Sequence, residues 1–461
     1  MARVPMASTT TYRIVVLLSL VFLLCSILLN FFTPLLQSHN SYIPSNNNND
    51  GSSIISKDSP KSPLYNASTP QQTRIAQLLH RSISRMKYLA TPRERASTQT
   101  QTQTQTQEPP PDISTKVTYD PKSYLYIASY YIGTPPQKIL AFVDTASDLI
   151  WTNSQTAFKS SDSKTYSSLP CKDKTFCQKL PSNQRACKGS DPKCTYKIEY
   201  SDGSSTTGVI SQDQFWFDAP AGQSSPKEVG FLGFGYAISA SSEHFTGEDI
   251  NGCLGLSRVS PFSFISQSRI QKFSHCFVKD ASRSSIMYFG SQAIIHLEDS
   301  TPLEGTGYYY VKLEGILVGD NKVKVTPRQL GTIYVDSGAS YSMLKEIAFT
   351  PFLELIKKVV AKPIAPSPHK YLEFCFKATK AEVEGLPMVK FQFTNNVNVV
   401  FANDVTYMEF DDGVWCLAIL RSSEKDLSVL GNFQMTNLNV GYDIERNMMS
   451  FTSANCAAST Y

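Results

Sequence analysis

Short apolar and aromatic runs alternate with clusters of Gly, Pro, Asn, Asp and Ser along most of this chain. The alternation begins at about Val117, and residues 124–132, 139–143 and 308–318 are examples of the apolar runs. Runs of this length between turn-forming residues predict β-strands. One longer apolar pattern, Met343–Ala361, has the spacing of a helix. We therefore expect a many-stranded β protein with few helices.

Near the start of the chain, an almost unbroken apolar run at residues 14–32 follows a short segment that carries Arg3 and Arg13. This arrangement is typical of a segment that directs a chain into the secretory pathway. The run is also long enough to span a bilayer. We predict a signal peptide over residues 1–37, and a retained membrane anchor is the alternative.

Residues 38–116 have the composition of a prosegment and low-complexity linker, with a polar Asn tract and alternating Thr and Gln. Within this part, residues 71–89 place apolar side chains at helical spacing, with Arg and Lys expected on the opposite face. Two interpretations stay open: an amphipathic helix in a disordered region, or a basic prosegment helix that covers an acidic cleft until it is removed. Asn66-Ala67-Ser68 is an acceptor sequence for N-glycosylation.

Length and charge narrow the class of protein. The chain has 461 residues, which predicts two or three folded units. Its formal net charge of +4 is small for this length, so we expect no nucleic-acid partner.

In an oxidising compartment the cysteines should form disulfides. Nine cysteines remain once Cys25 of the leader is set aside, so at least one has no partner within the chain.

One unit of sequence occurs twice. An apolar run ends in Asp144 and continues with Thr and small residues, and a second apolar run ends in Asp336 and continues with Ser and small residues. Roughly a hundred residues later, each copy has two apolar residues followed by a glycine, at Gly255 and Gly431. A repeat of this size predicts two homologous lobes, each of which supplies one aspartate.

A pair of neighbouring aspartates suits the hydrolysis of peptide bonds. This reaction needs a base that activates water and an acid that protonates the departing nitrogen. Two carboxylates about 3 Å apart do not both ionise easily, so they share one proton and supply both groups at the same pH. Such a pair titrates as a unit.

These motifs resemble those of the pepsin-like aspartic peptidases, and in particular the atypical plant group typified by nepenthesins. The matching segments include FVDTASDLIW at Asp144, VDSGAS at Asp336, Tyr200–Ser204, and 428–443. The resemblance implies an all-β, bilobal pepsin-like aspartic peptidase with two related β-barrel-like lobes and a few short helices. The N-terminal catalytic lobe would span residues 117–300, and the C-terminal catalytic lobe would span residues 301–461.

The resemblance also gives roles to individual residues. Asp144 and Asp336 would be the catalytic pair of an aspartic endopeptidase, which needs no metal or cofactor and acts on proteins or peptides. Tyr200 would lie on a mobile flap, a hairpin that Asp202-Gly203 also predicts as a turn sequence. Trp151 would donate its indole N–H to the Tyr200 hydroxyl.

Four smaller residues would complete the site. The hydroxyls of Thr145 and Ser337 would cross-link the two lobes under the cleft, and Ser147 and Gly338 would support the carboxylates through the small turns that follow each aspartate.

Cysteine pairing follows from the same resemblance. It would join Cys171 to Cys194, Cys177 to Cys187, Cys276 to Cys456, and Cys375 to Cys416. Cys253 would be left unpaired and buried, where a cysteine behaves as a small apolar side chain.

Two positions depart from the pattern of the family. Ala146 replaces a glycine, at a cost of about 1 kcal/mol if that position needs an unusual φ. Ala339 stands where a Ser or Thr hydroxyl commonly supports the second carboxylate. Because losing a hydrogen bond to the ionised form raises a carboxyl pKa, we predict an activity optimum well above about pH 2.

The main alternative is a catalytically weak or inactive relative that binds or inhibits other proteins, and Ala146 is the feature that favours it. The chain lacks the motifs of other hydrolase classes, since it has no HExxH zinc site and no GxSxG nucleophile elbow. His275-Cys276 could suggest a thiol nucleophile, but a disulfide cysteine beside a bystander histidine is the simpler interpretation.

We expect a monomer in the secretory pathway, most simply secreted to the apoplast, with the vacuole or a membrane surface as alternatives.

Overall fold

The structure of the protein is a computed structural model that describes residues 71–90, 110, 112–121, 123–154, 157–187, 192–199, 205–219, 226–241, 251–411, 413–425 and 427–457. The chain divides into two compact units, Met1–Ser53 and Ile54–Tyr461, and the described residues all belong to the second. The predicted signal segment and the Asn66 acceptor lie outside these residues. Among the helices described, none is both long and apolar enough to cross a membrane.

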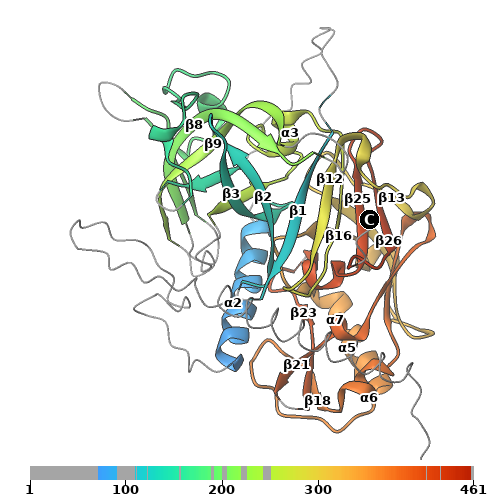
Figure 1. The fold of residues 1–461 in the computed structure, drawn as a ribbon. Coiled ribbons are helices and arrows are strands. Elements are labelled where there is room, and N and C mark those ends of the chain that lie inside the picture. The colour runs from blue at the N-terminus through green and yellow to red at the C-terminus, as the bar shows by residue number, and fades with distance from the viewer. Residues whose placement is uncertain are drawn as a thin grey trace, which may run out of the picture. The chain divides into compact units, whose positions relative to one another are not determined.

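The described part of the chain is built mainly of β-strands (Figure 1). This confirms the predicted all-β class. The largest sheet contains β1 (Ile113–Asp120), β2 (Leu125–Ile132), β3 (Gln137–Asp144), β4 (Trp151–Asn153), β5 (Ser167–Ser168), β6 (Arg185–Ala186), β7 (Thr195–Glu199), β8 (Ser205–Phe217), β9 (Lys227–Ser241), β10 (Gly252–Gly255), β11 (Lys272–Cys276), β12 (Ser284–Phe289), β13 (Ser300–Pro302), β25 (Leu438–Asp443) and β26 (Met448–Ser453). Their order is β13-β26-β25-β11-β12-β1-β2-β3-β10-β4-β9-β8-β7-β6, with β5 beside β8.

Two further sheets form the C-terminal half. The larger one has the order β20-β19-β14-β16-β24-β17-β23, with β15 beside β14, and the smaller one has the order β18-β22-β21. Their strands are β14 (Tyr310–Val318), β15 (Asn321–Lys322), β16 (Thr332–Asp336), β17 (Ser342–Leu344), β18 (Cys375–Lys377), β19 (Val389–Phe393), β20 (Val397–Phe401), β21 (Tyr407–Asp411), β22 (Val414–Leu417), β23 (Ile419–Arg421) and β24 (Ser428–Gly431).

The helices are short apart from two. The α-helices are α2 (Gln71–Ala90), α3 (Phe264–Ser268), α4 (Pro327–Leu330), α5 (Glu346–Val360), α6 (Lys380–Glu384) and α7 (Asn403–Thr406). Single turns of 3-10 helix are η2 (Ser160–Asp162), η3 (Cys177–Lys179), η4 (Gly290–Gln292), η5 (Leu297–Asp299), η6 (Thr394–Asn396) and η7 (Asn432–Met435).

The repeat seen in the sequence is also a repeat of strand pairing. β3 runs parallel to β10 and aligns Asp144 with Gly255. β16 runs parallel to β24 and aligns Asp336 with Gly431. A Cβ atom on either glycine would come within 2.5 Å of backbone atoms in the loop after the aspartate. Glycine is therefore needed at both places, because the strand must pass close to that loop.

Helix α5 begins later than the sequence pattern predicts. Met343 was expected to start it, but Met343 lies in β17, where it pairs with Leu420 of β23 and Val429 of β24. The helix begins at Glu346 and buries Phe349, Phe352, Leu353, Ile356 and Val360. Pairing with strands distant in sequence therefore overrides the helical spacing at Met343.

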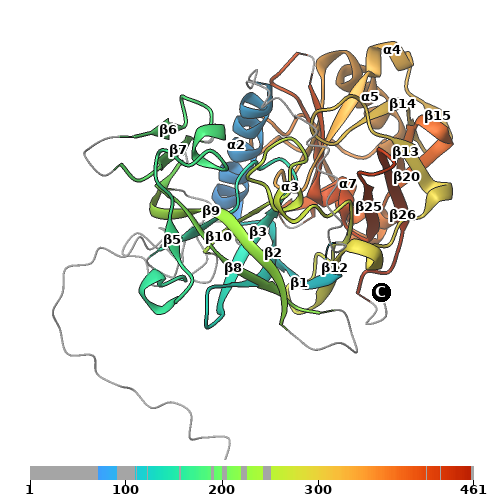
Figure 2. The same ribbon diagram turned by 90° about the horizontal axis from the view of Figure 1, so that it is seen from above.

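Helix α2 confirms the helix predicted at residues 71–89 and lies between N-terminal strands in teal and green and C-terminal strands in orange and red (Figures 1 and 2). Its apolar side chains are at most 5% exposed and pack in one cluster with Tyr341, Leu420 and Phe433. They are Ile75, Leu78, Leu79, Ile83 and Met86. Burying each such side chain contributes roughly 1.5–3 kcal/mol, so α2 is held by packing against the C-terminal half rather than by its own helix propensity.

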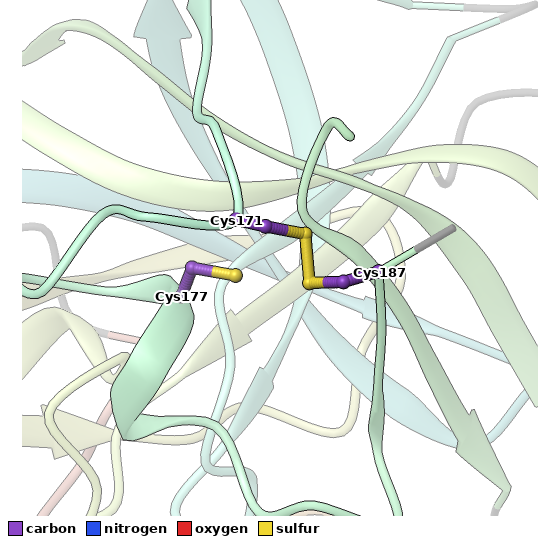
Figure 3. Close-up of side chains that lie close together, drawn as sticks. All are labelled: Cys171, Cys177 and Cys187. Atoms are coloured by element: carbon purple, nitrogen blue, oxygen red, sulfur yellow. A yellow bond between two sulfur atoms is a disulfide. The ribbon is translucent and has the colours of Figure 1, made fainter. Parts of the chain in front are cut away.

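Two of the four predicted disulfides are confirmed and two are wrong. Cys276 pairs with Cys456 and Cys375 pairs with Cys416. In the N-terminal half, however, Cys171 pairs with Cys187 (Figure 3), and Cys177 pairs with Cys194. The two bridges differ in how deeply they are buried. Cys177 and Cys194 are both fully buried in one apolar cluster, whereas Cys171 is half-buried and Cys187 is exposed.

The sulfur atoms of Cys171, Cys177 and Cys187 lie within 4.8 Å of one another. The Cys171 sulfur is thus close to two other sulfurs and bonds to only one of them, that of Cys187. Because each of these sulfurs is in a disulfide, none is available as a thiolate ligand for a metal. Cys253 is free and buried, as predicted.

Candidate active site

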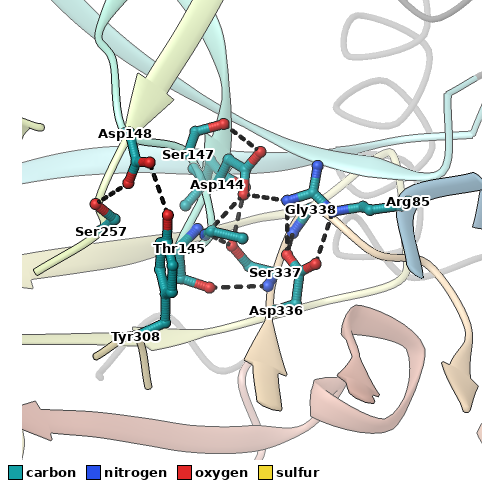
Figure 4. A network of polar contacts seen from close by, with 12 residues as sticks. Arg85, Asp144, Thr145, Ser147, Asp148, Ser257, Tyr308, Asp336, Ser337 and Gly338 are labelled. Carbon is teal, nitrogen blue, oxygen red and sulfur yellow. Dashed lines mark hydrogen bonds and ion pairs between the residues drawn. The ribbon is translucent and has the colours of Figure 1, made fainter. Parts of the chain in front are cut away.

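Two aspartates meet at the ends of matching strands. Asp144 ends β3, Asp336 ends β16, and both side chains are fully buried. Both carboxylates contact Arg85 of α2 (Figure 4). Nη2 of Arg85 lies 2.5 Å from Oδ1 of Asp144 and 2.9 Å from Oδ1 of Asp336, and Nε lies 2.6 Å from Oδ2 of Asp336. One nitrogen thus bridges both carboxylates, so they share one small site.

The loop after each aspartate turns back to hold its carboxylate. The backbone N–H of Ala146 donates to Oδ1 of Asp144 at 2.9 Å, and the hydroxyl of Ser147 donates to Oδ2 at 2.7 Å. The N–H of Gly338 donates to Oδ1 of Asp336 at 2.9 Å. The second loop has no hydroxyl at the place of Ser147, because Ala339 stands there.

Thr145 and Ser337 tie the two halves together beneath the carboxylates, in the contacts that were expected of them. The Thr145 hydroxyl accepts from the N–H of Ser337 at 3.0 Å and donates to the carbonyl of Val335 at 3.2 Å. The Ser337 hydroxyl accepts from the N–H of Thr145 at 3.1 Å and donates to the carbonyl of Val143 at 2.9 Å. This symmetric set fixes the distance between the strand ends that carry the aspartates.

The two loops differ in how much room they leave. A Cβ atom on Gly338 would lie 2.5 Å from Nη2 of Arg85 and 2.7 Å from the Asp144 carboxyl carbon, so no larger residue fits. Ala146 occupies the corresponding place in the first loop, where its methyl group packs in the apolar cluster that includes α2. Ala146 is not among the described residues with positive φ. The strain considered for this residue is therefore absent, and its N–H keeps its contact with the carboxylate.

The electrostatics of the site are dominated by burial. Burial raises the pKa of Asp336, the Arg85 guanidinium opposes this shift, and the nearby Asp144 carboxylate adds to it, with a net increase. For Arg85, burial lowers the pKa, but the attraction of both carboxylates outweighs this and keeps its pKa above the ordinary value. Arg85 is thus a permanent cation at this site.

A second polar group lies beside the pair. Asp148 accepts hydrogen bonds from the hydroxyls of Ser257 at 2.6 Å and Tyr308 at 2.7 Å (Figure 4).

Trp151 is buried and packs edge-on against Phe142. Tyr200 lies outside the described residues, so its contact with Trp151 stays a prediction. The strands of its hairpin are described, however, and β7 pairs with β8 up to Glu199 opposite Ser205.

Arg85 is the residue that the sequence analysis did not single out. The helical pattern was expected to place Arg and Lys away from the apolar face, and this is wrong for Arg85. It follows Leu78 by seven residues, two helical turns, and therefore lies at the edge of that face. A cation at the edge of an apolar stripe, in a helix expected to cover an acidic cleft, was the available signal.

Two β-rich halves that each bring one aspartate to a shared buried pair define the pepsin-like class of aspartic proteases. Two family models match the chain, "Xylanase inhibitor N-terminal" over residues 126–291 and "Xylanase inhibitor C-terminal" over residues 308–453. Among curated proteins, "Probable aspartic protease At2g35615" of Arabidopsis thaliana is 29% identical, over 88% of this chain and 93% of that protein. "Aspartic proteinase nepenthesin-2" of Nepenthes gracilis is 28% identical, over 72% of this chain and 78% of that protein.

Solved structures agree on the fold. Basic 7S globulin from soybean has a TM-score of 0.62 at 18% identity, over 77% of this chain and 100% of that chain. Conglutin gamma from lupine seeds has a TM-score of 0.62 at 20% identity, over 75% and 95% of the two chains. The chain belongs to the pepsin-like aspartic protease family, in its nepenthesin-like plant group.

Proposed function

We propose that this protein is an aspartic endopeptidase whose catalytic pair is Asp144 and Asp336. The observation that carries the proposal is that both buried carboxylates, one from each copy of the repeat, contact the same guanidinium nitrogen. A group small enough to replace that nitrogen, such as a water molecule, would contact both carboxylates in the same way.

The environment of Asp336 suggests how the two roles divide. Because burial raises the pKa of Asp336, this residue would carry the shared proton. Asp144 would then take a proton from water as the water oxygen attacks the peptide carbonyl. The pair would return a proton to the departing nitrogen, which completes the cleavage. The Thr145–Ser337 contacts would keep the two carboxylates at a working distance.

We also propose that α2 is an inhibitory prosegment. Arg85 occupies the place that water needs, its side chain is 15% exposed, and five buried apolar side chains anchor its helix. The described chain would therefore be a zymogen, in which α2 has to leave the cleft before a substrate enters. Its substrates would be proteins or peptides, and it would act as a monomer.

The four disulfides accord with a protein of the secretory pathway. We propose secretion to the apoplast as its destination, with the vacuole or a membrane surface as the alternatives.

The test is proteolysis of casein with and without pepstatin. We expect cleavage that pepstatin blocks and that Asp144→Asn and Asp336→Asn each abolish. Asp148→Asn is the matched control, because it makes the same chemical change at a carboxylate that contacts Ser257 and Tyr308. Cleavage that survives Asp144→Asn would overturn the proposal.

The second candidate is a weak or inactive binding protein or inhibitor. The names of the matching family models, which refer to a xylanase inhibitor, favour this candidate. Inhibition of a xylanase by a chain that cleaves no casein at any pH would support it. Pepstatin-sensitive cleavage without xylanase inhibition would exclude it.

A further inference from the structure

One buried tyrosine contacts the neighbourhood of both aspartates. Tyr309 lies between β13 and β14 and is fully buried. Its hydroxyl donates to the carbonyl of Leu256 at 2.8 Å, and its own carbonyl accepts from the N–H of Val335 at 2.9 Å. Leu256 follows β10, the strand that pairs with β3 up to Asp144, and Val335 is the residue before Asp336. Tyr309 thus reaches one aspartate strand through its main chain and the partner of the other through its side chain.

These contacts belong to a closed set of hydrogen bonds. The N–H of Leu256 donates to the carbonyl of Asp144 at 2.9 Å. Thr145, the next residue in the chain, donates its hydroxyl to the carbonyl of Val335 at 3.2 Å. Together with the two contacts of Tyr309, these bonds form a cycle that includes the backbone next to both aspartates, and we call it the hydrogen-bond cycle. A buried polar network whose members are all paired is rigid, so the cycle holds the two strand ends in one arrangement.

The tyrosine is itself held in place. Its ring makes edge contacts with the rings of Phe273, with centres 5.9 Å apart, and Tyr442, with centres 4.8 Å apart. Burial raises the pKa of Tyr309, so its hydroxyl keeps its proton at acidic and neutral pH. Because the Leu256 carbonyl can only accept, the hydroxyl stays a donor in this contact.

Arg258 holds the segment that leads into Tyr309. Its Nε donates to the carbonyl of Gly307 at 2.6 Å, and its Nη2 donates to the carbonyl of Gly305 at 3.0 Å. Its Nη1 donates to Oδ1 of Asn447 at 2.7 Å. The central carbon of its guanidinium lies 5.9 Å from the centre of the Tyr309 ring. A side chain from the N-terminal half therefore fixes the chain just before Tyr309.

We propose that Tyr309 is a positioning residue for the aspartate pair and that Arg258 positions Tyr309: the hydrogen-bond cycle, closed by the Tyr309 hydroxyl, sets the separation of the strand ends that carry Asp144 and Asp336. This inference rests on the proposed function for its effect on catalysis. Its effect on the hydrogen-bond cycle does not depend on that function.

The kinetic test is Tyr309→Phe in the full chain, which keeps the aromatic ring and removes the hydroxyl that closes the cycle. After acidification, we expect kcat for a fluorogenic peptide to fall about tenfold, with KM within twofold of the original value. The pH–rate profile should also become narrower. Two carboxylates that are no longer held close together interact less, so their two apparent pKa values move towards each other.

Tyr126→Phe is the matched control. Tyr126 is 1% exposed, and its hydroxyl lies 3.2 Å from that of Thr436, so it also joins residues of both halves but lies outside the cycle. We expect its kcat to stay within twofold of the original value and the width of its pH–rate profile to be unchanged, although its stability should fall. A profile of unchanged width in Tyr309→Phe, or the same narrowing in Tyr126→Phe, would overturn the proposal.

Arg258→Lys tests the supporting role. It keeps the charge, but one ammonium group cannot replace the divergent contacts of a guanidinium with two carbonyls and the Asn447 side chain. We expect kcat to fall about threefold. Because Arg258 acts through Tyr309, the double variant should stay within twofold of Tyr309→Phe alone. Losses that multiply in the double variant would overturn the role given to Arg258.

Hydrogen exchange separates this inference from the proposed function. The N–H groups of Leu256 and Val335 both donate within the hydrogen-bond cycle, so their exchange reports on the cycle itself. We expect faster exchange at both in Tyr309→Phe than in Tyr126→Phe. Equal exchange would overturn the inference, whereas an unmodified chain without pepstatin-sensitive cleavage, whose Tyr309→Phe variant shows the expected exchange, would overturn only the proposed function.

Discussion

At the scale of single residues, the two loops after the aspartates are alike in sequence but unequal in space. Gly338 has atoms of Arg85 and Asp144 where a side chain would start, whereas the methyl group of Ala146 packs against its surroundings. The departure from the family pattern at Ala146 is therefore accommodated, and the second loop carries the strict requirement for glycine.

This inequality gives a first prediction. Gly338→Ala should displace the Asp144 carboxylate and lower kcat at least a hundredfold, because the added carbon would lie 2.7 Å from the Asp144 carboxyl group. Ala146→Gly is the control and should change kcat less than threefold. Steady-state cleavage of a fluorogenic peptide measures both variants, and equal effects would contradict the geometric argument.

The missing hydroxyl at Ala339 gives a second prediction. Ala339→Ser should add a donor to the Asp336 carboxylate, and a hydrogen bond to the ionised form lowers a carboxyl pKa. Because Asp336 would carry the shared proton, the pair would then lose that proton at a lower pH, so the alkaline limb of the pH–rate profile should move in the acidic direction. A pH–rate profile measures the shift. An alkaline limb that stays in place, or moves upward, would show that Asp336 does not carry the shared proton.

A buried histidine gives a third prediction, for stability. His275 has a folded pKa of about 3, and an unfolded histidine has a pKa of about 6.5. Between these values the unfolded chain binds a proton that the folded chain does not, so stability falls as the pH decreases from 6.5 to 3. The loss at pH 3 should reach roughly 4 kcal/mol. Urea titrations should show that His275→Phe lacks this part of the pH dependence.

At the scale of elements, α2 is the part that would block the site if it acts as the proposed inhibitory prosegment. Protonation of Asp336 removes a charge from the partner of Arg85, and the raised pKa of Asp336 brings this about at a higher pH than for an ordinary aspartate. Acidification should therefore loosen α2 first at Arg85, while its apolar contacts persist.

Arg85→Ala provides a fourth prediction. We expect the unmodified chain to cleave substrate only after a lag that follows acidification, and Arg85→Ala should shorten this lag because only the apolar contacts of α2 then remain. Arg81→Ala, which makes the same charge change one turn earlier on α2, should keep the lag. Progress curves after a drop in pH measure the lag. A lag of the same length in all three proteins would mean that Arg85 does not contribute to holding α2 in the cleft.

Some elements of the fold could be predicted from the sequence, and others could not. The strands, helix α2 and the aspartate pair could be predicted because each depends on local spacing or on the repeat. The start of α5 could not, since Met343 is held in β17 by strands about eighty residues away in sequence. The contacts of Arg85 depend on how α2 packs against distant residues, and the pairing of Cys171 with Cys187 depends on which cysteines are buried together.

At the scale of the whole molecule, the largest sheet joins segments from both ends of the described chain. β25 and β26 follow the C-terminal strands in sequence, but β25 pairs with β11 of the N-terminal half. The disulfide between Cys276 and Cys456 connects the end of β11 to the segment after β26. The proposed division into lobes at residue 300 is thus crossed by both hydrogen bonds and a covalent bond.

This bond gives a fifth prediction. It closes a loop of 180 residues, against 41 residues for the bond between Cys375 and Cys416. On the chain-entropy argument, the first bond contributes about 5 kcal/mol and the second about 4 kcal/mol. Replacing Cys276 and Cys456 with serine should lower the free energy of unfolding more than replacing Cys375 and Cys416. Guanidinium titration measures both, and the reverse order would show that native-state contacts dominate.

The crossing of β25 into the N-terminal half bears on how the protein is made in the cell. While a ribosome is still adding residues before Leu438, β11 has no partner on one side and presents open backbone groups to other chains. The N-terminal half should therefore finish folding only after its own synthesis is complete, when β25 has been added. A nascent chain with such an open edge is prone to aggregate, so we expect chaperones to shield β11 until the late strand pairs with it.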